Sequence, residues 1–273
     1  MIIGLAQMHI AWENKELNKI YIEKYVEKFS EAVIGIDDTA MLLFPEMSLT
    51  GFSMNTEITA DENGESVEFV KKIADKYKVY LGVGWVKKQE ELCENHYSIV
   101  STDGEMISDY VKIHPFSYSG EDRYFQGGDN LALCTIKDFG IGTAICYDLR
   151  FPELFQAMSK KAELIIVPAN WPEKRCIHWS VLLAARAIEN QCYIAGVNCC
   201  GEIGGIIYSG NSVLHAPNGE IVAMHDVLSL DFEDMEKGLN QLFIYIIEND
   251  VDKERSSFPV KNDRREELYK KFY

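Results

Sequence analysis

Short apolar, β-branched runs alternate with longer amphipathic stretches along this chain, and the alternation limits which folds are open to it. Strands are predicted at residues 2–8, 41–44, 79–86, 96–101, 105–113, 131–136, 141–146, 164–168, 193–197, 212–215 and 242–248. Helices are predicted at residues 14–33, 67–77, 152–161 and 177–190. Hairpin turns at Asp103-Gly104 and Asn218-Gly219 are mixed with βα units. This pattern favours a layered α/β sandwich over a purely parallel, doubly wound sheet.

The composition is that of a folded protein with an acidic surface. The chain has 273 residues, is 47% hydrophobic and 26% charged, and contains no linker, low-complexity segment or repeat. We therefore expect a single domain over residues 1–273. The formal net charge of −16 repels phosphate backbones and anionic lipids, which argues against nucleic acid or membrane partners. An acidic substrate would need cations close to its binding site.

Cysteine usage and hydropathy favour a cytoplasmic protein. Seven cysteines without paired spacing indicate reduced thiols rather than a disulfide framework. The first residues lack the features of a signal peptide, and no apolar run approaches the roughly 20 residues of a membrane span. Cys176, His178, Cys192, Cys199 and Cys200 contain no CxxC pair, so we interpret the cysteines as buried thiols rather than metal ligands. Whether Cys199 and Cys200 are redox-active stays open.

Cys146 is the most informative single residue, because it follows the apolar run at residues 141–145 and precedes the sequence YDLRFPE. A nucleophile between a strand and a tight turn into a helix is exposed at the edge of the sheet where α/β folds place their sites. The same turn offers the backbone N–H of Tyr147 as a donor to an oxyanion. Taken alone, a cysteine after an apolar strand is more often a small core residue.

Glu46 and Lys112 also stand at the ends of predicted strands. Pro45 ends its strand and leaves the Glu46 carboxylate at the edge, while Lys112 lies between Val111 and Ile113 at the end of another strand. By itself, Glu46 would be better explained as a solvated loop acid or a charge at the start of a helix, and Lys112 could point to water from a half-buried strand. Three strand ends that present an acid, an amine and a thiol together are a stronger signal than any one of them.

These three residue types suit the hydrolysis of an amide. A thiolate attacks an amide carbonyl well, but the amine is a poor leaving group and needs a proton. A carboxylate in a partly apolar pocket can take the thiol proton, return it to the departing nitrogen and later activate water. A buried ammonium group stabilises the thiolate and the tetrahedral oxyanion. The sequence therefore predicts a thiol hydrolase with Cys146 as nucleophile, assisted by Glu46 and Lys112.

Three separated segments resemble the signature motifs of the nitrilase superfamily, in the family's order. They are FPEMSLTGF at residues 44–52, YVKIHPF at 110–116 and AICYDLRFPE at 144–153. The resemblance implies that Glu46 is the general base, Lys112 the oxyanion-stabilising lysine, Cys146 the nucleophile and Glu121 a second active-site glutamate. It also implies an αββα sandwich that pairs through its helices into a homodimer with an αββααββα core. It further implies chemistry without a metal or organic cofactor.

Later segments resemble the omega-amidase branch of that family. They are VPANWPEKR at residues 167–175, AARAIENQ at 184–191 and FPVKNDRR at 258–265. This branch hydrolyses the terminal amide of 2-oxoglutaramate or 2-oxosuccinamate, so a carboxylate-bearing substrate is expected. Arg175 is the candidate partner of that carboxylate, and Asn170 and Trp171 are candidates for the pocket wall. The chain departs from the branch after Asn198, where a basic residue is missing, and in the acidic stretch at residues 226–240.

Other functions stay open at this point. Within the same chemistry, the alternatives are an N-carbamoyl-amide hydrolase, a general aliphatic amidase and a nitrilase. From other classes, the alternatives are a non-catalytic interaction protein on the same scaffold and a nucleotide-binding module. The intact set of Glu46, Lys112 and Cys146 argues against the interaction protein. The absence of a glycine-rich phosphate-binding fingerprint argues against the nucleotide-binding module.

Overall fold

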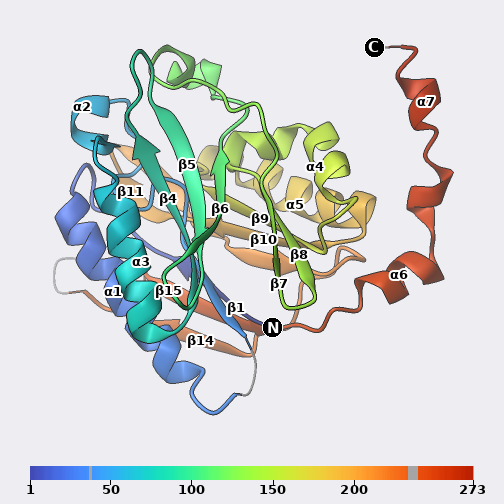
Figure 1. Ribbon diagram of the computed structural model, residues 1–273, viewed down its shortest axis with the longest axis horizontal. Helices are drawn as coiled ribbons and strands as arrows, with labels where there is room; N and C mark the ends of the chain where they lie inside the picture. The colour runs from blue at the N-terminus through green and yellow to red at the C-terminus, as the bar shows by residue number, and fades with distance from the viewer. Residues whose placement is uncertain (37–38, 233–238, 273) are drawn as a thin grey trace.

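Two β-sheets lie face to face between layers of helices in the computed structural model, which describes residues 1–36, 39–232 and 239–272 (Figure 1). The first sheet has the strand order β14-β15-β1-β2-β4-β5-β6, with β3 paired to β4, and the second has the order β13-β10-β9-β8-β7. Helices α1 and α3 pack on the outer face of the first sheet, and α4 and α5 on the outer face of the second. This arrangement confirms the predicted αββα sandwich.

The first sheet contains both parallel and antiparallel pairs. Its strands are β1 (Ile2–Gln7), β2 (Ala40–Leu43), β3 (Ala60–Asp61), β4 (Tyr80–Lys87), β5 (Glu94–Val100), β6 (Met106–Val111), β14 (Asp226–Ser229) and β15 (Gln241–Ile246). β1, β2 and β4 run parallel, and β5 and β6 form the hairpin predicted around Asp103-Gly104. Because β5 is antiparallel to both β4 and β6, the carboxyl ends of β2, β4 and β6 lie along one edge of the sheet.

The second sheet is built around three parallel strands, β8, β9 and β10. Its strands are β7 (Leu133–Ile136), β8 (Phe139–Thr143), β9 (Leu164–Ala169), β10 (Tyr193–Asn198) and β13 (Val213–His215). The helices are α1 (Lys15–Ala32), α2 (Thr56–Thr59), α3 (Glu65–Tyr77), α4 (Pro152–Met158), α5 (Cys176–Asn190), α6 (Val251–Ser257) and α7 (Glu266–Tyr269). Within the described ranges, no helix combines the length and hydropathy needed to cross a membrane.

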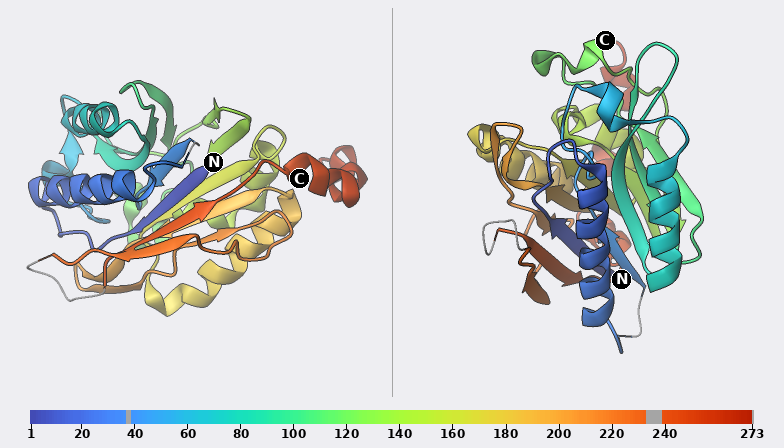
Figure 2. Two further views of the ribbon diagram at one scale, coloured as in Figure 1. Left: turned by 90° about the horizontal axis from the view of Figure 1, so that it is seen from below. Right: turned by 90° about the vertical axis from the view of Figure 1, so that its left-hand side faces the viewer.

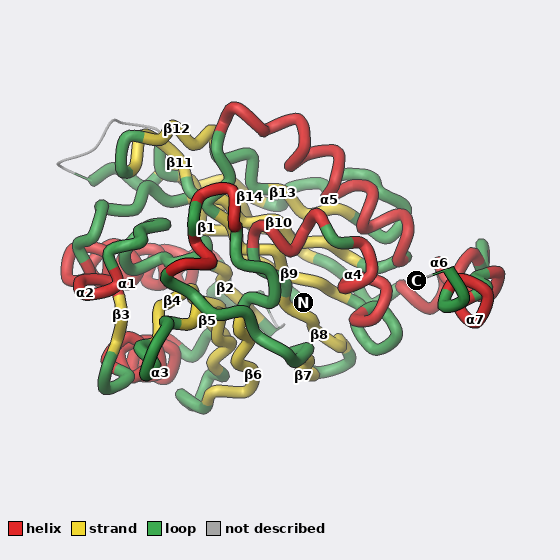
Figure 3. Tube along the Cα trace, turned by 90° about the horizontal axis from the view of Figure 1, so that it is seen from above, coloured by secondary structure: helices red, strands yellow, loops and turns green. Residues whose placement is uncertain are grey.

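The alternation of side chains along the strands builds two separate apolar layers. On β1, Ile3 and Leu5 face the second sheet and pack in one cluster with Ile166 of β9. The intervening Ile2 and Ala6 face the other way and pack in the cluster that includes α1 and α3. Strands buried on both faces therefore read as continuous apolar runs. Figure 2 shows α1 and α5 on opposite sides of the strands, and Figure 3 shows the strands between the helices.

A two-stranded hairpin outside the sandwich is not predicted by the sequence pattern. It consists of β11 (Cys200–Ile203) and β12 (Ile206–Ser209). Gly204 and Gly205 form its turn, and both have positive φ, a conformation that glycine adopts without strain. Ile206 and Ile207 are both exposed, so β12 lacks the apolar alternation of a half-buried strand.

The C-terminal segment that contains α6 and α7 lies at one end of the sandwich (Figure 1). Arg255, Lys261 and Arg264 donate hydrogen bonds to carbonyl oxygens at the C-terminal ends of α4 and α5, among them that of Ser159. Cations are favoured at these positions because the carbonyl ends of helices carry partial negative charge. The basic residues of the segment therefore attach it to the two helices of the second sheet.

Candidate active site

The two sheets together bring Glu46, Lys112 and Cys146 to one end of the sandwich. Glu46 follows β2 by three residues and Lys112 follows β6 directly, so both extend from carboxyl ends of the first sheet. Cys146 belongs to the second sheet, because it follows β8, which ends at Thr143 rather than at the predicted residue 146. The expectation that the three share the edge of one sheet is thus corrected to the adjoining edges of two.

The loop that carries Glu46 passes close over β4. The backbone N–H of Ser48 donates to the carbonyl oxygen of Gly84 at 3.0 Å. A Cβ atom on Gly84 would lie 2.4 Å from the backbone nitrogen of Met47, so a larger residue would push the loop away. Glycine at this position of β4 therefore permits the close approach that sets the height of Glu46 above the sheet.

Lys112 binds two carboxylates in the buried centre of the site. Its Nζ donates to Oε1 of Glu46 at 2.8 Å and to the two oxygens of Glu121 at 3.0 and 2.8 Å. The three side chains are at most 1% exposed. Burial alone would lower the pKa of Lys112, but the Glu121 and Glu46 carboxylates raise it above its ordinary value, so the ammonium stays charged. Burial raises the pKa of Glu121, with an opposing effect of Lys112 and a further rise from Glu46.

Two asparagines hold Glu46 from the sides. The backbone N–H of Asn170 donates to Oε2 of Glu46 at 3.0 Å, and its Nδ2 donates to the Glu46 carbonyl oxygen at 2.7 Å. Asn95 donates from Nδ2 to Oε1 of Glu46 at 2.9 Å and to Oε1 of Glu121 at 3.3 Å. Asn170 belongs to the predicted pocket residues, whereas Asn95 does not. Both oxygens of the Glu46 carboxylate are therefore fixed in place.

Cys146 has a left-handed backbone conformation, with φ of 46°, and it opens a 3₁₀ turn over Cys146–Arg150. Non-glycine residues in this conformation are strained and collect at functional sites. Its Sγ lies 4.0 Å from the carbonyl oxygen of Asn170. Burial and the hydrogen-bonded Glu46 carboxylate raise the pKa of the thiol well above its ordinary value, and Lys112 offsets this only in part. The resting thiol is therefore protonated at neutral pH.

A buried aspartate, Asp148, connects the turn after β8 to the end of β6. Its Oδ2 accepts hydrogen bonds from the backbone N–H of Ile145 and the hydroxyl of Tyr110, both at 2.9 Å. Its Oδ1 accepts from the backbone N–H of His114 at 3.0 Å and contacts Nδ1 of that ring at 2.7 Å. These contacts fix the spacing between the segments that supply the thiol and the ammonium. Sequence patterns place Asp148 in a motif but do not reveal this bridging position.

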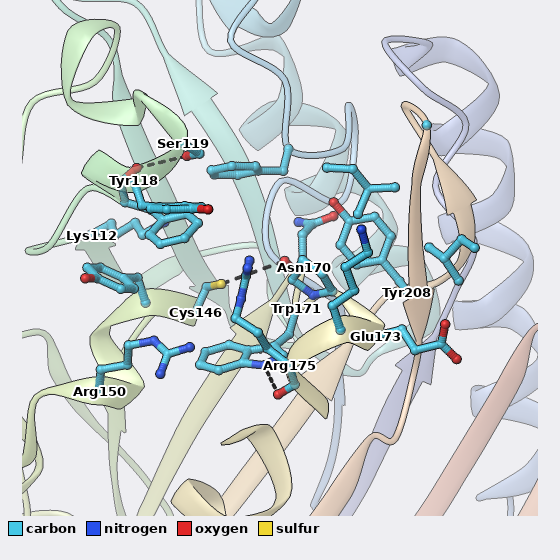
Figure 4. Close-up of a pocket in the computed structure, with 18 residues that line it drawn as sticks. Lys112, Tyr118, Ser119, Cys146, Arg150, Asn170, Trp171, Glu173, Arg175 and Tyr208 are labelled. Carbon is cyan, nitrogen blue, oxygen red and sulfur yellow. Dashed lines mark hydrogen bonds between the residues drawn. The ribbon is translucent and has the colours of Figure 1, made fainter. Parts of the chain in front are cut away.

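The thiol and the ammonium line a cavity of about 420 Å³ (Figure 4). The cavity is lined by Phe52, Lys112, Phe116, Tyr118, Ser119, Cys146, Tyr147, Arg150, Asn170, Trp171, Pro172, Glu173, Lys174, Arg175, Gly205, Ile206, Ile207 and Tyr208. Of the five residues predicted to position the substrate, Tyr147, Asn170, Trp171 and Arg175 belong to this lining, whereas Glu121 is buried against Lys112 and does not. Most of the remaining wall is aromatic or aliphatic, and part of it comes from the unpredicted hairpin β11–β12.

Two guanidinium groups face the cavity, each against an aromatic ring (Figure 4). The Arg175 group lies 5.4 Å from the ring centre of Phe116, and the Arg150 group lies 4.7 Å from that of Trp171. Burial, together with the charge of Arg175, lowers the pKa of Arg150. In the part of the chain that the structure describes, neither guanidinium has a carboxylate within ion-pair distance. Both cations are thus available to an anionic ligand, although sequence reasoning selected Arg175 alone.

The sequence predicts that four of the other cysteines, Cys176, Cys192, Cys199 and Cys200, are buried thiols, and the structure confirms this for three of the four. Cys192, Cys199 and Cys200 are buried and free, whereas Cys176 is only half-buried. The Sγ of Cys199 contacts Oδ1 of Asn170 at 3.2 Å. Over residues 1–36, 39–232 and 239–272, no three His, Cys, Asp or Glu side chains form a group that could hold a metal ion.

Comparisons with known proteins identify the family of the chain. The profile of the family described as carbon-nitrogen hydrolase matches residues 2–230. The chain is 32% identical to the 2-oxoglutaramate amidase of Bacillus subtilis over 275 residues, with 98% of each chain covered. It is 29% identical to the omega-amidase YafV of Escherichia coli strain K12 over 265 residues, with 97% of this chain and 96% of the relative covered.

A solved structure shares the fold at lower identity. It is a mutant of the amidase from Nesterenkonia sp. AN1 in which the acetamide moiety of fluoroacetamide is added covalently to the active-site cysteine. The TM-score is 0.84 at 20% identity, and the alignment covers 100% of this chain and 97% of that one. The fold therefore agrees with the nitrilase-superfamily resemblance of the sequence motifs. The match over residues 2–230 shows that this chain belongs to the carbon-nitrogen hydrolase family of enzymes.

Proposed function

We propose that this protein hydrolyses the terminal amide of a short oxo acid that carries a carboxylate, 2-oxoglutaramate or 2-oxosuccinamate, and releases ammonia. The observation that carries the proposal is the buried group of Lys112, Glu46 and Glu121, whose ammonium lines, together with the Cys146 thiol, a cavity that also holds two arginines. The relatives named 2-oxoglutaramate amidase and omega-amidase support the choice of substrate.

The first half of the reaction forms a thioester on Cys146. Glu46 removes the Sγ proton, and the thiolate attacks the amide carbonyl carbon. The developing oxyanion accepts hydrogen bonds from Nζ of Lys112 and the backbone N–H of Tyr147. The tetrahedral intermediate collapses when Glu46 returns its proton to the amide nitrogen, so the C–N bond breaks and ammonia leaves. Because the thiol of Cys146 is protonated at rest, this mechanism requires Glu46 as a base.

The second half hydrolyses the thioester. Glu46, again a carboxylate, takes a proton from water while the water oxygen attacks the thioester carbonyl carbon. The same donors stabilise the second oxyanion. The C–S bond then breaks, the sulfur takes the proton back from Glu46, and the oxo dicarboxylic acid leaves. Glu121 does not react in this scheme. Its two oxygens hold Nζ of Lys112 toward the oxyanion position.

Arg175 supplies the contact that selects a carboxylate-bearing amide. A guanidinium binds a carboxylate through two parallel hydrogen bonds, and the stacking of Arg175 on Phe116 limits how far the group can rotate. Trp171 and Asn170 form the neighbouring wall. The Trp171 indole N–H donates to the carbonyl oxygen of Arg175 at 2.8 Å, so the wall and the arginine are held together.

A general aliphatic amidase is the second candidate, because most of the cavity lining is apolar. Ammonia release from a panel of 2-oxoglutaramate, 2-oxosuccinamate, N-carbamoyl amino acids, neutral amides and nitriles tests both. We expect the highest kcat/KM for the two oxo-acid amides. A higher kcat/KM for a neutral amide would favour the aliphatic amidase, and one for a carbamoyl compound or a nitrile would reject both assignments.

We also propose that the chain forms one domain and that two copies pair through the helical layer. On α5, the apolar side chains of Ile177, Val181 and Ile188 are each more than half exposed. Apolar residues gathered on one helix are typical of a contact surface. Sedimentation of the parent and of an Ile177→Lys/Val181→Glu variant tests the pairing. A dimer that dissociates only in the variant supports it, and a monomeric parent contradicts it.

A further inference from the structure

Asn95 lies where two carboxylates and an ammonium meet, although no sequence motif draws attention to it. It occupies the second position of β5, and in the β5–β6 hairpin His96 is opposite Val111, so Asn95 is opposite Lys112. The backbone N–H of Lys112 donates to the Asn95 carbonyl oxygen at 2.9 Å, which continues this register. The residue is 1% exposed. Its side chain therefore stands beside Nζ of Lys112 at the centre of the site.

The charges at this centre do not balance. Glu46 and Glu121 are both fully buried, and a single ammonium, that of Lys112, lies between them. Two buried carboxylates in contact with one cation repel each other and favour the uptake of a proton. The Nδ2 group of Asn95 donates to Oε1 of Glu46 at 2.9 Å and to Oε1 of Glu121 at 3.3 Å. It is therefore a second, uncharged donor to two of the three carboxylate oxygens that Lys112 contacts.

The contacts of the Asn95 amide favour the orientation in which Nδ2, rather than Oδ1, faces the two carboxylates. In the described part of the chain, Oδ1 of Asn95 is buried and has no hydrogen-bond partner. A flipped amide would place this oxygen against the two carboxylate oxygens and leave Nδ2 without an acceptor. Burial of an unsatisfied carbonyl oxygen is unfavourable, so the site retains this asparagine for its donor end.

We propose that Asn95 is a positioning residue that keeps Glu46 and Glu121 ionised together, so that Glu46 remains a free base beside Cys146. The inference rests on the proposed hydrolase function and extends it to a residue outside the Glu46, Lys112 and Cys146 set. Without the Asn95 donor, the two carboxylates share a proton at neutral pH. A proton on this pair removes the base that the first half of the reaction requires.

The titratable groups around Asn95 lie on two faces of β5. On the inner side, the Glu46 and Glu121 carboxylates face Lys112 and Cys146, with Cys199 and Tyr208 beyond them. Burial, together with the charges of Glu46 and Cys146, raises the pKa values of Cys199 and Tyr208. On the outer side, His96 contacts Glu94 and Asp109 at 3.0 Å. Successive strand residues point to opposite faces, so this second group does not contact the Glu46 oxygens.

The test is the pH dependence of kcat/KM for 2-oxoglutaramate hydrolysis in Asn95→Leu, which keeps the number of side-chain heavy atoms and removes the donor. We expect the acid limb to move to higher pH by about one unit, a roughly tenfold loss of rate below the midpoint, with the alkaline side unchanged. Asn95→Asp keeps the shape but adds a carboxylate, and a larger shift in the same direction is expected. An acid limb at the parent position in either variant overturns the proposal.

A readout without turnover separates this proposal from the proposed function. The infrared C=O band of a buried, protonated carboxyl group reports proton uptake by the pair, and Glu121→Gln identifies which part of the band comes from Glu121. We expect the band of Asn95→Leu to persist to higher pH than that of the parent, even if no amide is hydrolysed. Equal titration of the band in both proteins overturns the proposal, whereas a shifted band without hydrolysis rejects only the function.

Asn18 offers a matched control for the loss of a buried asparagine. It is fully buried and hydrogen-bonds to the backbone of Ala11 and Leu49. Asn18→Leu is expected to lower stability but to leave the acid limb in place. In the Glu121→Gln background, where the second charge is gone, Asn95→Leu is expected to move the acid limb much less. An undiminished shift in that background contradicts the shared-charge mechanism.

Discussion

The Nζ atom of Lys112 lies 2.8 Å from Oε1 of Glu46, although 66 residues separate the two in the chain. Both are buried, so the fold removes an ammonium and a carboxylate from water at a cost of several kcal/mol per ion. This cost is offset only if the partners and their hydrogen bonds are complete. The contact between Lys112 and Glu46 therefore affects both the stability of the fold and the chemistry of the site. Its disruption should change the free energy of unfolding as well as turnover.

Lys112→Met tests the structural side of this contact. The variant leaves Glu46 and Glu121 buried without their cation, so we expect the free energy of unfolding at neutral pH to fall by about 3–5 kcal/mol. Because burial already holds the pKa of Glu121 above its ordinary value, the folded variant binds protons more readily than the unfolded chain. The stability that this group contributes is therefore fully present below its unfolded-state pKa and is lost as the pH rises through its folded-state pKa. Urea unfolding at several pH values measures both effects.

The double variant Lys112→Met/Glu121→Gln provides the control for that prediction. It removes one carboxylate along with the cation, so it should recover part of the lost stability and flatten the pH dependence. Both variants are expected to be inactive, because both lack the ammonium donor to the oxyanion. Unfolding free energies that match the parent in both variants would contradict the buried ion group.

Arg175→Ala tests the selection of carboxylate-bearing substrates. Removal of a charge-assisted contact should raise KM for 2-oxoglutaramate by roughly 10- to 100-fold and leave neutral amides almost unchanged. Lys174→Ala is the matched control, because Lys174 is an adjacent, exposed cation at the same cavity. A small effect of Lys174→Ala is expected. Equal losses on acidic and neutral substrates would remove the proposed role of Arg175.

The pH dependence of Cys146 alkylation tests the protonation state of the resting thiol. Burial and the Glu46 carboxylate raise the pKa of Cys146 above its ordinary value of 9.0. The thiolate fraction, and with it the rate of reaction with iodoacetamide, should therefore still be rising with pH at that value. Peptide mass spectrometry follows this residue separately from the other cysteines. A rate that is already maximal near neutral pH would show a thiolate paired with Lys112 and would remove the need for Glu46 as first base.

Much of the central site could be predicted because the sequence indicates where the strands end. Pro45 marks the end of β2, and the apolar run before Cys146 marks the end of β8, so the thiol, the acid and the amine were placed at sheet edges correctly. What the sequence pattern did not show is that two sheets supply these edges. Hydrophobic periodicity reports which face of a strand is buried but not which sheet the strand joins.

The site residues that were not predicted are placed by strand pairing and tertiary packing rather than by a pattern in the sequence. Asn95 could have been found from the predicted hairpin around Asp103-Gly104, because its register sets Asn95 opposite Lys112. Arg150 stands in a motif, but only the turn that begins at Cys146 directs it into the cavity (Figure 4). The hairpin β11–β12 carries exposed isoleucines, and its place in the cavity wall follows from tertiary packing alone.

The most direct test of the account is to trap the covalent intermediate on Cys146. The protein is mixed with 2-oxoglutaramate, quenched with acid during turnover, digested and analysed by mass spectrometry. The Cys146→Ala variant is the control, and an unchanged thermal unfolding midpoint shows that it is folded. We predict an acyl adduct on the Cys146 peptide that disappears as substrate is exhausted, and no ammonia release by Cys146→Ala. Ammonia release at the parent rate by Cys146→Ala would contradict the proposed mechanism.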